Sequence, residues 1–185
     1  MNPHRGDASA DDTRPGEAQH PHRQAAPKSL GVVVVTVSDT RTLETDTGGA
    51  LVIEALEAAG HSLVDRRIVP DEPTAIEAAL EAALAQDAAH AVIFTGGTGV
   101  APRDVTPETI EARLERAVPG FGELFRMLSY EDIGSAALLS RATAGLVRGR
   151  VVFVIPGSRG AVRLAMDRLI VPEIGHLAGE AVKRR

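Results

Sequence analysis

Residues 31–37 read Gly-Val-Val-Val-Val-Thr-Val, and this stretch decides the fold class. Side chains branched at the β-carbon favour the extended backbone of a strand. A strand with one face in water alternates apolar and polar residues, but an unbroken run of valines is typical of a parallel strand covered on both faces. The run therefore predicts an internal strand of a sheet that lies between two layers of helices.

Patterns of helices and strands alternate on the C-terminal side of this run. Strand-like stretches cover residues 62–69, 91–95 and 151–155. Between and after them, apolar residues recur with helical spacing, for example from Val52 and from Ile76. This alternation predicts an α/β fold, a three-layer α/β/α sandwich with a mainly parallel sheet.

Single residues predict where the helices begin and end. Gly60 follows the first apolar stripe as a C-terminal glycine, and Pro73 suits the first position of the second helix. Thr106 followed by Pro107 predicts a hydroxyl cap on the third helix. The apolar spacing continues from there and predicts that this helix extends to Ala117.

Length and composition exclude several classes of protein. A chain of 185 residues fits one domain, at about 150 residues per domain. We expect that domain at residues 30–185. Residues 1–29 are rich in proline and have Met1 as their only strongly apolar residue, which predicts a disordered tail. The formal charge of −5 argues against nucleic-acid binding, and the absence of cysteine excludes disulfides and thiolate metal sites. The sequence has no apolar run of about 18 residues and no signal-peptide pattern, so we expect no membrane span and a cytoplasmic protein.

The topology also predicts where the functional site lies. In a parallel sheet, the loops that follow the strands collect at one edge, and ligands bind there. Polar residues and glycines fill these loops. The candidate site residues are Ser38, Asp39, Asp46, Asp71, Thr95, Gly96, Gly97, Thr98, Gly99, Asp104, Pro156, Gly157 and Ser158.

The loop at residues 95–99 reads Thr-Gly-Gly-Thr-Gly and directly follows a predicted strand. Glycine permits a positive φ and close approach of the backbone, so successive N–H groups can hold an anion such as a phosphate. The loop lacks the lysine of a P-loop and the spacing of a dinucleotide-binding motif. A tight turn without a ligand is the alternative for this loop, and a simple helix cap is the alternative for Ser158.

Carboxylates accompany the glycine-rich loop. A phosphate beside carboxylates needs a cation between them, and proteins typically hold Mg²⁺ through one or two carboxylates together with phosphate oxygens. The pattern therefore predicts a Mg²⁺-dependent site for a phosphorylated ligand. Helix caps are the alternative for Asp46 and Asp71, and an ion pair with Arg103 is the alternative for Asp104.

Five motifs in order resemble the molybdopterin-binding fold. They are Thr-Gly-Gly-Thr-Gly at residues 95–99, Arg-Asp-Val-Thr-Pro-Glu at 103–108, Pro-Gly-Phe-Gly-Glu at 119–123, Leu-Ser-Arg at 139–141 and Pro-Gly-Ser at 156–158. Over about residues 30–180 the chain resembles the family of molybdenum cofactor biosynthesis protein B and the molybdopterin adenylyltransferases. Residues 125–134 resemble the protein B branch more closely.

The resemblance implies an activity and the residues that perform it. Adenylyltransferases of this family join molybdopterin to AMP from ATP, with Mg²⁺, and release pyrophosphate. Asp71 and Asp104 match the two aspartates linked to this catalysis. We also expect them to hold or orient Mg²⁺ between the two anions. Ser140 and Arg141 join the loop residues above as expected contacts of the nucleotide or the pterin, with a surface ion pair as the alternative for Arg141. The family also implies homo-oligomers, either trimers or hexamers.

Other functions remain open at this point. One is a molybdopterin-binding or scaffold protein of the same pathway without catalysis, which ATP turnover with molybdopterin would distinguish from the enzyme. A second is a molybdate-inserting enzyme, although such chains are longer and have several domains. A third is a general nucleotide-binding regulator, which nucleotide binding without a pterin would favour. Other enzymes of molybdenum cofactor synthesis are the expected protein partners.

Overall fold

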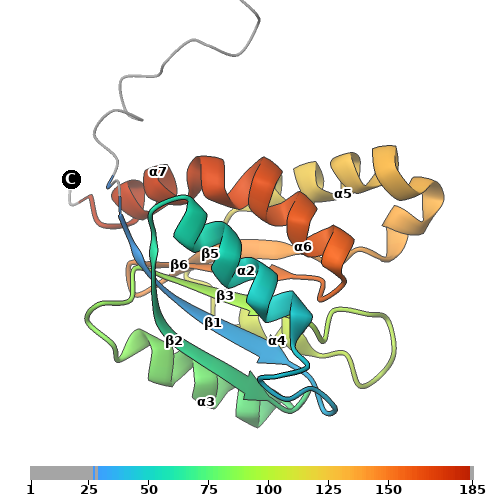
Figure 1. Cartoon of the computed structure of the whole chain (residues 1–185), viewed down its shortest axis with the longest axis horizontal. Helices are drawn as coiled ribbons and strands as arrows, with labels where there is room; N and C mark the ends of the chain where they lie inside the picture. The colour runs from blue at the N-terminus through green and yellow to red at the C-terminus, as the bar shows by residue number, and fades with distance from the viewer. Residues whose placement is uncertain (1–26, 28, 184–185) are drawn as a thin grey trace, which may run out of the picture.

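A six-stranded sheet forms the middle layer of the computed structural model, in the strand order β2-β1-β3-β6-β5-β4 (Figure 1). The strands are β1 (Gly31–Val37), β2 (Ser62–Val69), β3 (Ala91–Thr95), β4 (Arg116–Ala117), β5 (Thr143–Val147) and β6 (Arg150–Ile155). β2, β1, β3 and β6 run parallel, while β5 pairs antiparallel with both β6 and β4. The structure describes residue 27 and residues 29–183, so the tail predicted for residues 1–29 lies almost entirely outside the described residues.

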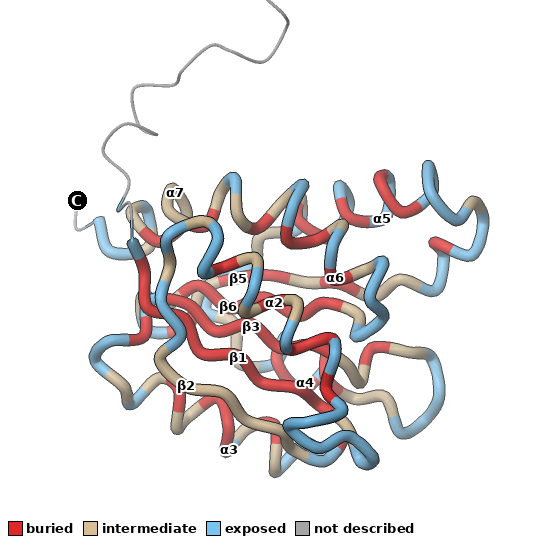
Figure 2. The backbone as a smooth tube through the Cα atoms, in the orientation of Figure 1, coloured by how far each residue is buried: buried red, intermediate tan, exposed pale blue. Residues whose placement is uncertain are grey.

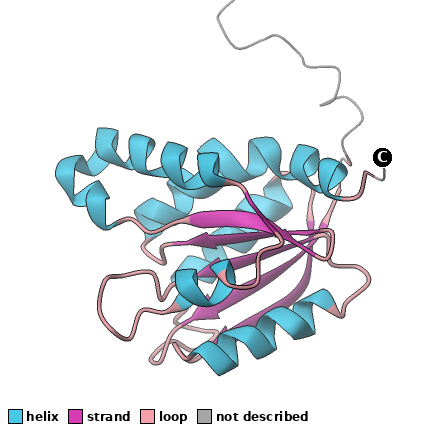
Figure 3. Ribbon diagram, turned by 180° about the vertical axis from the view of Figure 1, so that it is seen from behind, coloured by secondary structure: helices cyan, strands magenta, loops and turns pink. Residues whose placement is uncertain are grey.

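Helices cover both faces of the sheet, as Figure 1 shows and Figure 3 shows from behind. They are α2 (Thr47–Ala58), α3 (Pro73–Leu84), α4 (Thr106–Glu111), α5 (Pro119–Ile133), α6 (Arg159–Ala165) and α7 (Val171–Ala181), with a 3₁₀ helix η1 (Gly134–Leu139) and a π-helix η2 (Met166–Ile170). α3 and α4 cover one face, and the other helices cover the opposite face. The predicted three-layer sandwich with a mainly parallel sheet is confirmed. Within the described residues, no helix is long and apolar enough to cross a membrane.

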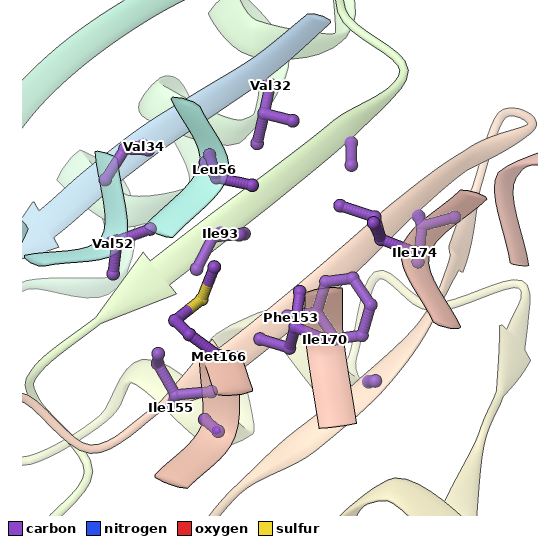
Figure 4. Close-up of a cluster of buried hydrophobic side chains, with 14 of the residues drawn as sticks. Val32, Val34, Val52, Leu56, Ile93, Phe153, Ile155, Met166, Ile170 and Ile174 are labelled. Atoms are coloured by element: carbon purple, nitrogen blue, oxygen red, sulfur yellow. The ribbon is translucent and has the colours of Figure 1, made fainter. Parts of the chain in front are cut away.

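Strand β1 lies between two hydrophobic clusters. All of its residues are buried, and Figure 2 shows the burial concentrated in the central strands. Val32 and Val34 belong to the cluster that also holds Leu56 of α2 (Figure 4), whereas Val33 and Val35 belong to the cluster under α3. Each fully buried valine stabilises the fold by about 1.5 kcal/mol or more. The interpretation of residues 31–37 as an internal strand is therefore confirmed.

The hydroxyl cap predicted at Thr106 is wrong. α4 begins at Thr106 itself, Val105 occupies the cap position, and no side chain caps the helix. The Thr106 amide donates to the Gly97 carbonyl oxygen at 3.1 Å. The glycine-rich loop therefore fixes the start of this helix, and Thr106 belongs with that loop.

The predicted extension of the same helix to Ala117 is also wrong. α4 ends at Glu111, and Ala117 lies in the short strand β4. On either side of β4, the amides of Glu115 and Val118 donate to carbonyl oxygens of β5 at 2.9 and 2.8 Å. Pairing with a strand distant in the sequence outweighs the local helical pattern, as is usual for strands.

The other predicted helix boundaries are confirmed. Gly60 has a φ of +83° just after α2, and Pro73 is the first residue of α3. The antiparallel hairpin of β5 and β6 was not predicted. Its tight turn consists of Arg148 and Gly149, with φ values of +48° and +73°. Two successive residues with positive φ are typical of a two-residue hairpin loop.

Candidate functional site

The loops that follow β1, β3 and β6 meet at one edge of the sheet, as predicted. The Gly96 amide donates to the Ile155 carbonyl oxygen at 3.1 Å, which joins the loop after β3 to the end of β6. A β-carbon built on Gly96 would lie 2.4 Å from the Val37 carbonyl oxygen, and one built on Gly157 would lie 3.3 Å from the Gly96 α-carbon. The strand ends are so close that only a glycine fits at Gly96.

The glycine-rich loop needs its glycines for conformation as well. Gly96 and Gly97 have φ values of +100° and +60°, in the region that residues with a β-carbon disfavour. These φ values are compatible with both interpretations of this loop, an anion-holding loop and a tight turn without a ligand. Its capacity to hold an anion stays a prediction.

Asp71 approaches this loop from the end of β2. A β-carbon built on Gly97 would lie 2.7 and 2.8 Å from the two Asp71 carboxylate oxygens and 2.2 Å from the Thr106 hydroxyl oxygen. The residue is 9% exposed, and its Oδ1 accepts a hydrogen bond from the Val105 amide at 3.3 Å. The cap position of α3 belongs to Glu72. The helix-cap interpretation of Asp71 is therefore wrong.

Asp104 follows the glycine-rich loop in the sequence and also lies close to it. A β-carbon built on Gly99 would lie 2.6 Å from Asp104 Oδ2, which accepts a hydrogen bond from the Ala101 amide at 3.1 Å. The alternative ion pair between Asp104 and Arg103 is absent from the described residues. Arg103 Nε donates instead to Asp39 Oδ2 at 2.5 Å. Asp71 and Asp104 thus converge on the glycine-rich loop, as the sequence predicted.

Asp39 joins the loops that carry the two aspartates. Its Oδ1 accepts a hydrogen bond from the Asp71 amide at 3.3 Å, while its Oδ2 pairs with Arg103. The hydrogen bond from Arg103 lowers the pKa of Asp39 from its ordinary value. Asp39 was predicted to line the ligand pocket. In the structure it also connects its own loop, after β1, to the loops that carry Asp71 and Arg103.

The charges around Asp71 repel one another. Burial raises the pKa of Asp71, and the negative charges of Asp104 and Asp39 raise it further. Within the described residues there is no group of three or more histidine or acidic side chains that could hold a metal ion. If the glycine-rich loop holds phosphate as predicted, two carboxylates would be enough for Mg²⁺ that arrives with a nucleotide, because phosphate oxygens and water would complete its shell.

Arg141 fixes the glycine-rich loop to the segment that carries Asp104. Its Nε donates to the Thr98 carbonyl oxygen at 3.1 Å, and its Nη2 donates to the Asp104 carbonyl oxygen at 2.7 Å. The same guanidinium forms an ion pair with Glu108. The ion-pair interpretation of Arg141 is therefore correct, but the residue also positions the backbone of the site.

Asp46, also predicted as a site residue, has both carboxylate oxygens engaged elsewhere. It is the N-cap of α2, where its Oδ1 accepts from the Gly49 amide at 2.9 Å. Its Oδ2 accepts from the Thr36 hydroxyl at 2.7 Å and from Arg66 at 2.9 Å. The cap interpretation of Asp46 is thus confirmed. Burial opposes its charge, but the bonds from Gly49, Thr36 and Arg66 together lower its pKa.

We expect Asp46→Ala to lower the free energy of unfolding by about 3 kcal/mol, because it leaves the Arg66 charge without its partner. Asp46→Asn keeps the shape and serves as the control for charge. Because the pKa is lowered in the folded state, the charge stabilises the fold above the ordinary value of 3.8, and this stabilisation is lost as the pH falls below it. Denaturant midpoints of wild type and Asp46→Asn should therefore converge in acid. Parallel curves would contradict this role.

A cavity of about 400 Å³ opens beside the glycine-rich loop, within the range of small-molecule sites. Its lining includes Thr98, Gly99, Ser140, Pro156 and Ser158, all predicted site residues. Ser158 also caps α6 by accepting from the Ala161 amide, so its cap interpretation is confirmed. Asp71 and Asp104 do not line this cavity but lie next to the loop that does.

A smaller cavity of about 110 Å³ lies on the other side of the same edge. The predicted residues in its lining are Ser38, Asp46, Thr95, Gly96 and Gly157. Asp39 lines a third cavity together with Ser38, and Arg141 lines a fourth together with Ser140. The structure therefore distributes the predicted residues over several cavities instead of one.

Sequence reasoning missed the contribution of α5 and η1 to the larger cavity. Ser129, Asp132 and Ile133 of α5 and Leu139 of η1 form part of its wall. Residues 125–134 were singled out only as a mark of one branch of the family. The position of that motif, between two motifs already assigned to the site, was the available signal.

The chain is similar to known proteins in both sequence and structure. The family model described as "probable molybdopterin binding domain" matches residues 33–176. Molybdenum cofactor biosynthesis protein B of Bacillus subtilis is 52% identical over 163 residues, which cover 88% of this chain and 96% of that protein.

Two solved structures have the same fold. A crystal structure of molybdenum cofactor biosynthesis protein B has a TM-score of 0.84 and 49% identity, with 86% of this chain and 99% of that chain covered. The tungsten cofactor synthesizing protein MoaB of Pyrococcus furiosus has a TM-score of 0.78 and 38% identity, with 85% and 100% covered.

Proposed function

Because the chain belongs to the molybdopterin-binding domain family, we propose that it acts in molybdenum cofactor biosynthesis as a molybdopterin adenylyltransferase. The convergence of Asp71 and Asp104 on the glycine-rich loop carries this proposal. Two carboxylates beside a phosphate-holding loop repel the phosphate unless a cation lies between them. The arrangement therefore favours chemistry on a Mg-nucleotide over the binding of a pterin alone.

In the proposed step, an oxygen of the terminal phosphate of molybdopterin attacks the α-phosphorus of ATP. A new P–O bond forms at the α-phosphorus, its bond to the bridging oxygen breaks, and pyrophosphate leaves in line with the attack. Such phosphoryl chemistry depends on positioning and neutralisation of charge, and it needs no protein nucleophile.

The chain's own residues would bind and orient the two substrates. N–H groups of the loop at residues 96–99 would hold phosphate, and hydroxyls in the cavity wall, such as those of Ser140 and Ser158, would supply polar contacts. Asp71 and Asp104 would hold Mg²⁺, which when bound supplies positive charge to the reacting phosphates.

Pyrophosphate release tests this function. Purified protein should release pyrophosphate when molybdopterin, ATP and Mg²⁺ are all present, and should release none when any one is omitted. Binding of molybdopterin without pyrophosphate release would instead show a binding or scaffold protein. Binding of ATP that is indifferent to molybdopterin would favour a nucleotide-binding regulator.

The implied trimer or hexamer is also part of the proposal. Large apolar side chains are exposed along α5 and η1, and they are Leu124, Met127, Tyr130, Ile133, Leu138 and Leu139. Exposed apolar side chains that gather on one helix and on the segment that follows it are typical of a protein–protein interface. We propose that a second copy of the chain covers these side chains.

Light scattering on the wild type should therefore give the mass of a trimer or a hexamer. Leu138 is 84% exposed, so Leu138→Glu should leave the fold intact and weaken association about tenfold or more, by placing a charge in the interface. Val182→Glu, at a position that is 61% exposed near the C-terminal end of α7, is the matched control and should change nothing. A wild type that stays monomeric at micromolar concentration would contradict the proposal.

A further inference from the structure

Thr106 carries a buried hydroxyl that nothing among the described residues satisfies. The residue has an exposed fraction of 0%, and its Oγ1 has no hydrogen-bond partner. Its backbone is fixed, because its amide donates to the Gly97 carbonyl oxygen at 3.1 Å. The backbone therefore holds this hydroxyl beside the glycine-rich loop, where it has no hydrogen-bond partner among the described residues.

The hydroxyl and the Asp71 carboxylate lie beside the same α-carbon. A β-carbon built on Gly97 would lie 2.2 Å from Thr106 Oγ1, 2.7 Å from Asp71 Oδ2 and 2.8 Å from Asp71 Oδ1. Asp71 Oδ1 already accepts from the Val105 amide, whereas Oδ2 has no donor among the described residues. An ionised carboxylate is a pure acceptor and a hydroxyl is a donor, so the two groups are complementary.

Stability alone gives no reason for a threonine here. A buried hydroxyl without an acceptor is unfavourable, and valine has nearly the same shape without that need. A group that the fold holds in place at a cost to stability is a candidate for a role in function.

We propose that Thr106 is a positioning residue for Asp71, whose hydroxyl donates a hydrogen bond to Asp71 Oδ2 when Mg-ATP occupies the site. In this state the Asp71 side chain turns so that Oδ2 comes within hydrogen-bond distance of the hydroxyl. The carboxylate is then held from two sides, by the Val105 amide and by the Thr106 hydroxyl, and faces the metal–phosphate complex in one orientation. This inference rests on the proposed function.

Thr106→Val tests the proposal, and Thr109→Val is its matched control. Thr109 lies one turn further along α4, is nearly as buried, and its hydroxyl is satisfied, because it donates to the Val105 carbonyl oxygen at 2.8 Å. Thr109→Val should lower the melting temperature and leave kcat unchanged. Thr106→Val should do the opposite: the melting temperature without ligand should stay the same or rise, and kcat should fall about tenfold or more with KM for molybdopterin unchanged.

Two further variants test whether the loss of kcat comes from the missing hydroxyl and whether the hydroxyl acts through Asp71. Thr106→Ser restores the hydroxyl and should return kcat to within about twofold of wild type. Thr106→Val should add less than a twofold loss when it is combined with Asp71→Asn, because it acts through that carboxylate. Normal kcat in Thr106→Val, or a loss that serine does not rescue, would overturn the proposal.

A binding measurement separates this inference from the proposed function. Mg-ATP should raise the melting temperature of the wild type more than that of Thr106→Val, whereas ATP with a chelator should raise both equally. If this difference is found in a wild type that releases no pyrophosphate, the adenylyltransferase activity fails and the role of Thr106 stands. If the shifts are equal, the role of Thr106 fails whatever the activity.

Discussion

Replacing Asp71 with asparagine should lower pyrophosphate release by about 10²-fold or more without loss of stability. The loss of turnover follows from removing a fixed charge from the metal–phosphate complex, and single preorganised groups in active sites contribute effects of that size. Stability should be retained because the asparagine amide oxygen can still accept from the Val105 amide. The structure even predicts a gain, because the pKa of Asp71 is raised by burial and by its acidic neighbours. A carboxyl with a raised folded-state pKa destabilises the fold when it is charged, so at neutral pH the neutral side chain removes a cost.

Asp104→Asn should reduce turnover similarly, and Asp65→Asn is the control. Asp65 pairs with Arg67 on β2, away from the glycine-rich loop, so its replacement should spare turnover. Melting temperature, molybdopterin affinity and pyrophosphate release should be measured for all three variants under saturating Mg-ATP. Molybdopterin affinity should change little or improve in the two site variants, because a negative charge near its phosphate is removed. Turnover of the Asp71 and Asp104 variants within a few-fold of wild type would remove both residues from the catalytic site.

Gly97→Ala should abolish turnover and destabilise the fold by about 3 kcal/mol or more. The added β-carbon would face the Thr106 hydroxyl at 2.2 Å and both Asp71 oxygens at under 3 Å, so the loop or the carboxylate must move. The positive φ of +60° adds a cost of about 1 kcal/mol for any residue with a β-carbon. Denaturant unfolding and pyrophosphate release measure the two effects.

Gly60→Ala separates the cost of a positive φ from the cost of the close contacts of the added β-carbon. Gly60 has a φ of +83°, and nothing lies within 4 Å of a β-carbon built there. This variant should therefore show only the conformational cost of about 1 kcal/mol and normal turnover. Equal destabilisation by the two alanines would mean that the contacts with Asp71 and Thr106 are absent in solution.

The sequence was most informative where one element's own residues determine its structure. The run of valines in β1 is itself typical of a strand buried on both faces, so it predicts an internal strand without knowledge of which helices cover it. The end of α4 was mispredicted because it depends on hydrogen bonds to β5, which comes more than 25 residues later in the chain. No local pattern encodes a partner at that distance.

The same distinction applies to the site. The convergence of Asp71 and Asp104 was predictable, because parallel strands place their following loops at one edge. The pairing of Arg103 with Asp39 was not, since Asp104 is the nearer acid in sequence and only the folded loops bring Asp39 closer. Thr106 was identified as a cap from its position before a proline, and its buried hydroxyl beside Gly97 became visible only in three dimensions.

The two outermost strands of the sheet have a consequence for behaviour in concentrated solution. The outer side of an edge strand has unpaired amides and carbonyls, and a strand of another molecule can form hydrogen bonds with them. Such pairing is one way in which ordered aggregates begin. β4 is only two residues long, too short to act as a template. β2 is eight residues long but carries Asp65, Arg66 and Arg67 in its middle, and charged side chains on an edge strand disfavour pairing with another strand. The short length of β4 protects one edge of the sheet, and the charges of β2 protect the other. Among substitutions on these strands, we expect Arg67→Val on β2 to increase fibril formation first, because it removes one of these charges.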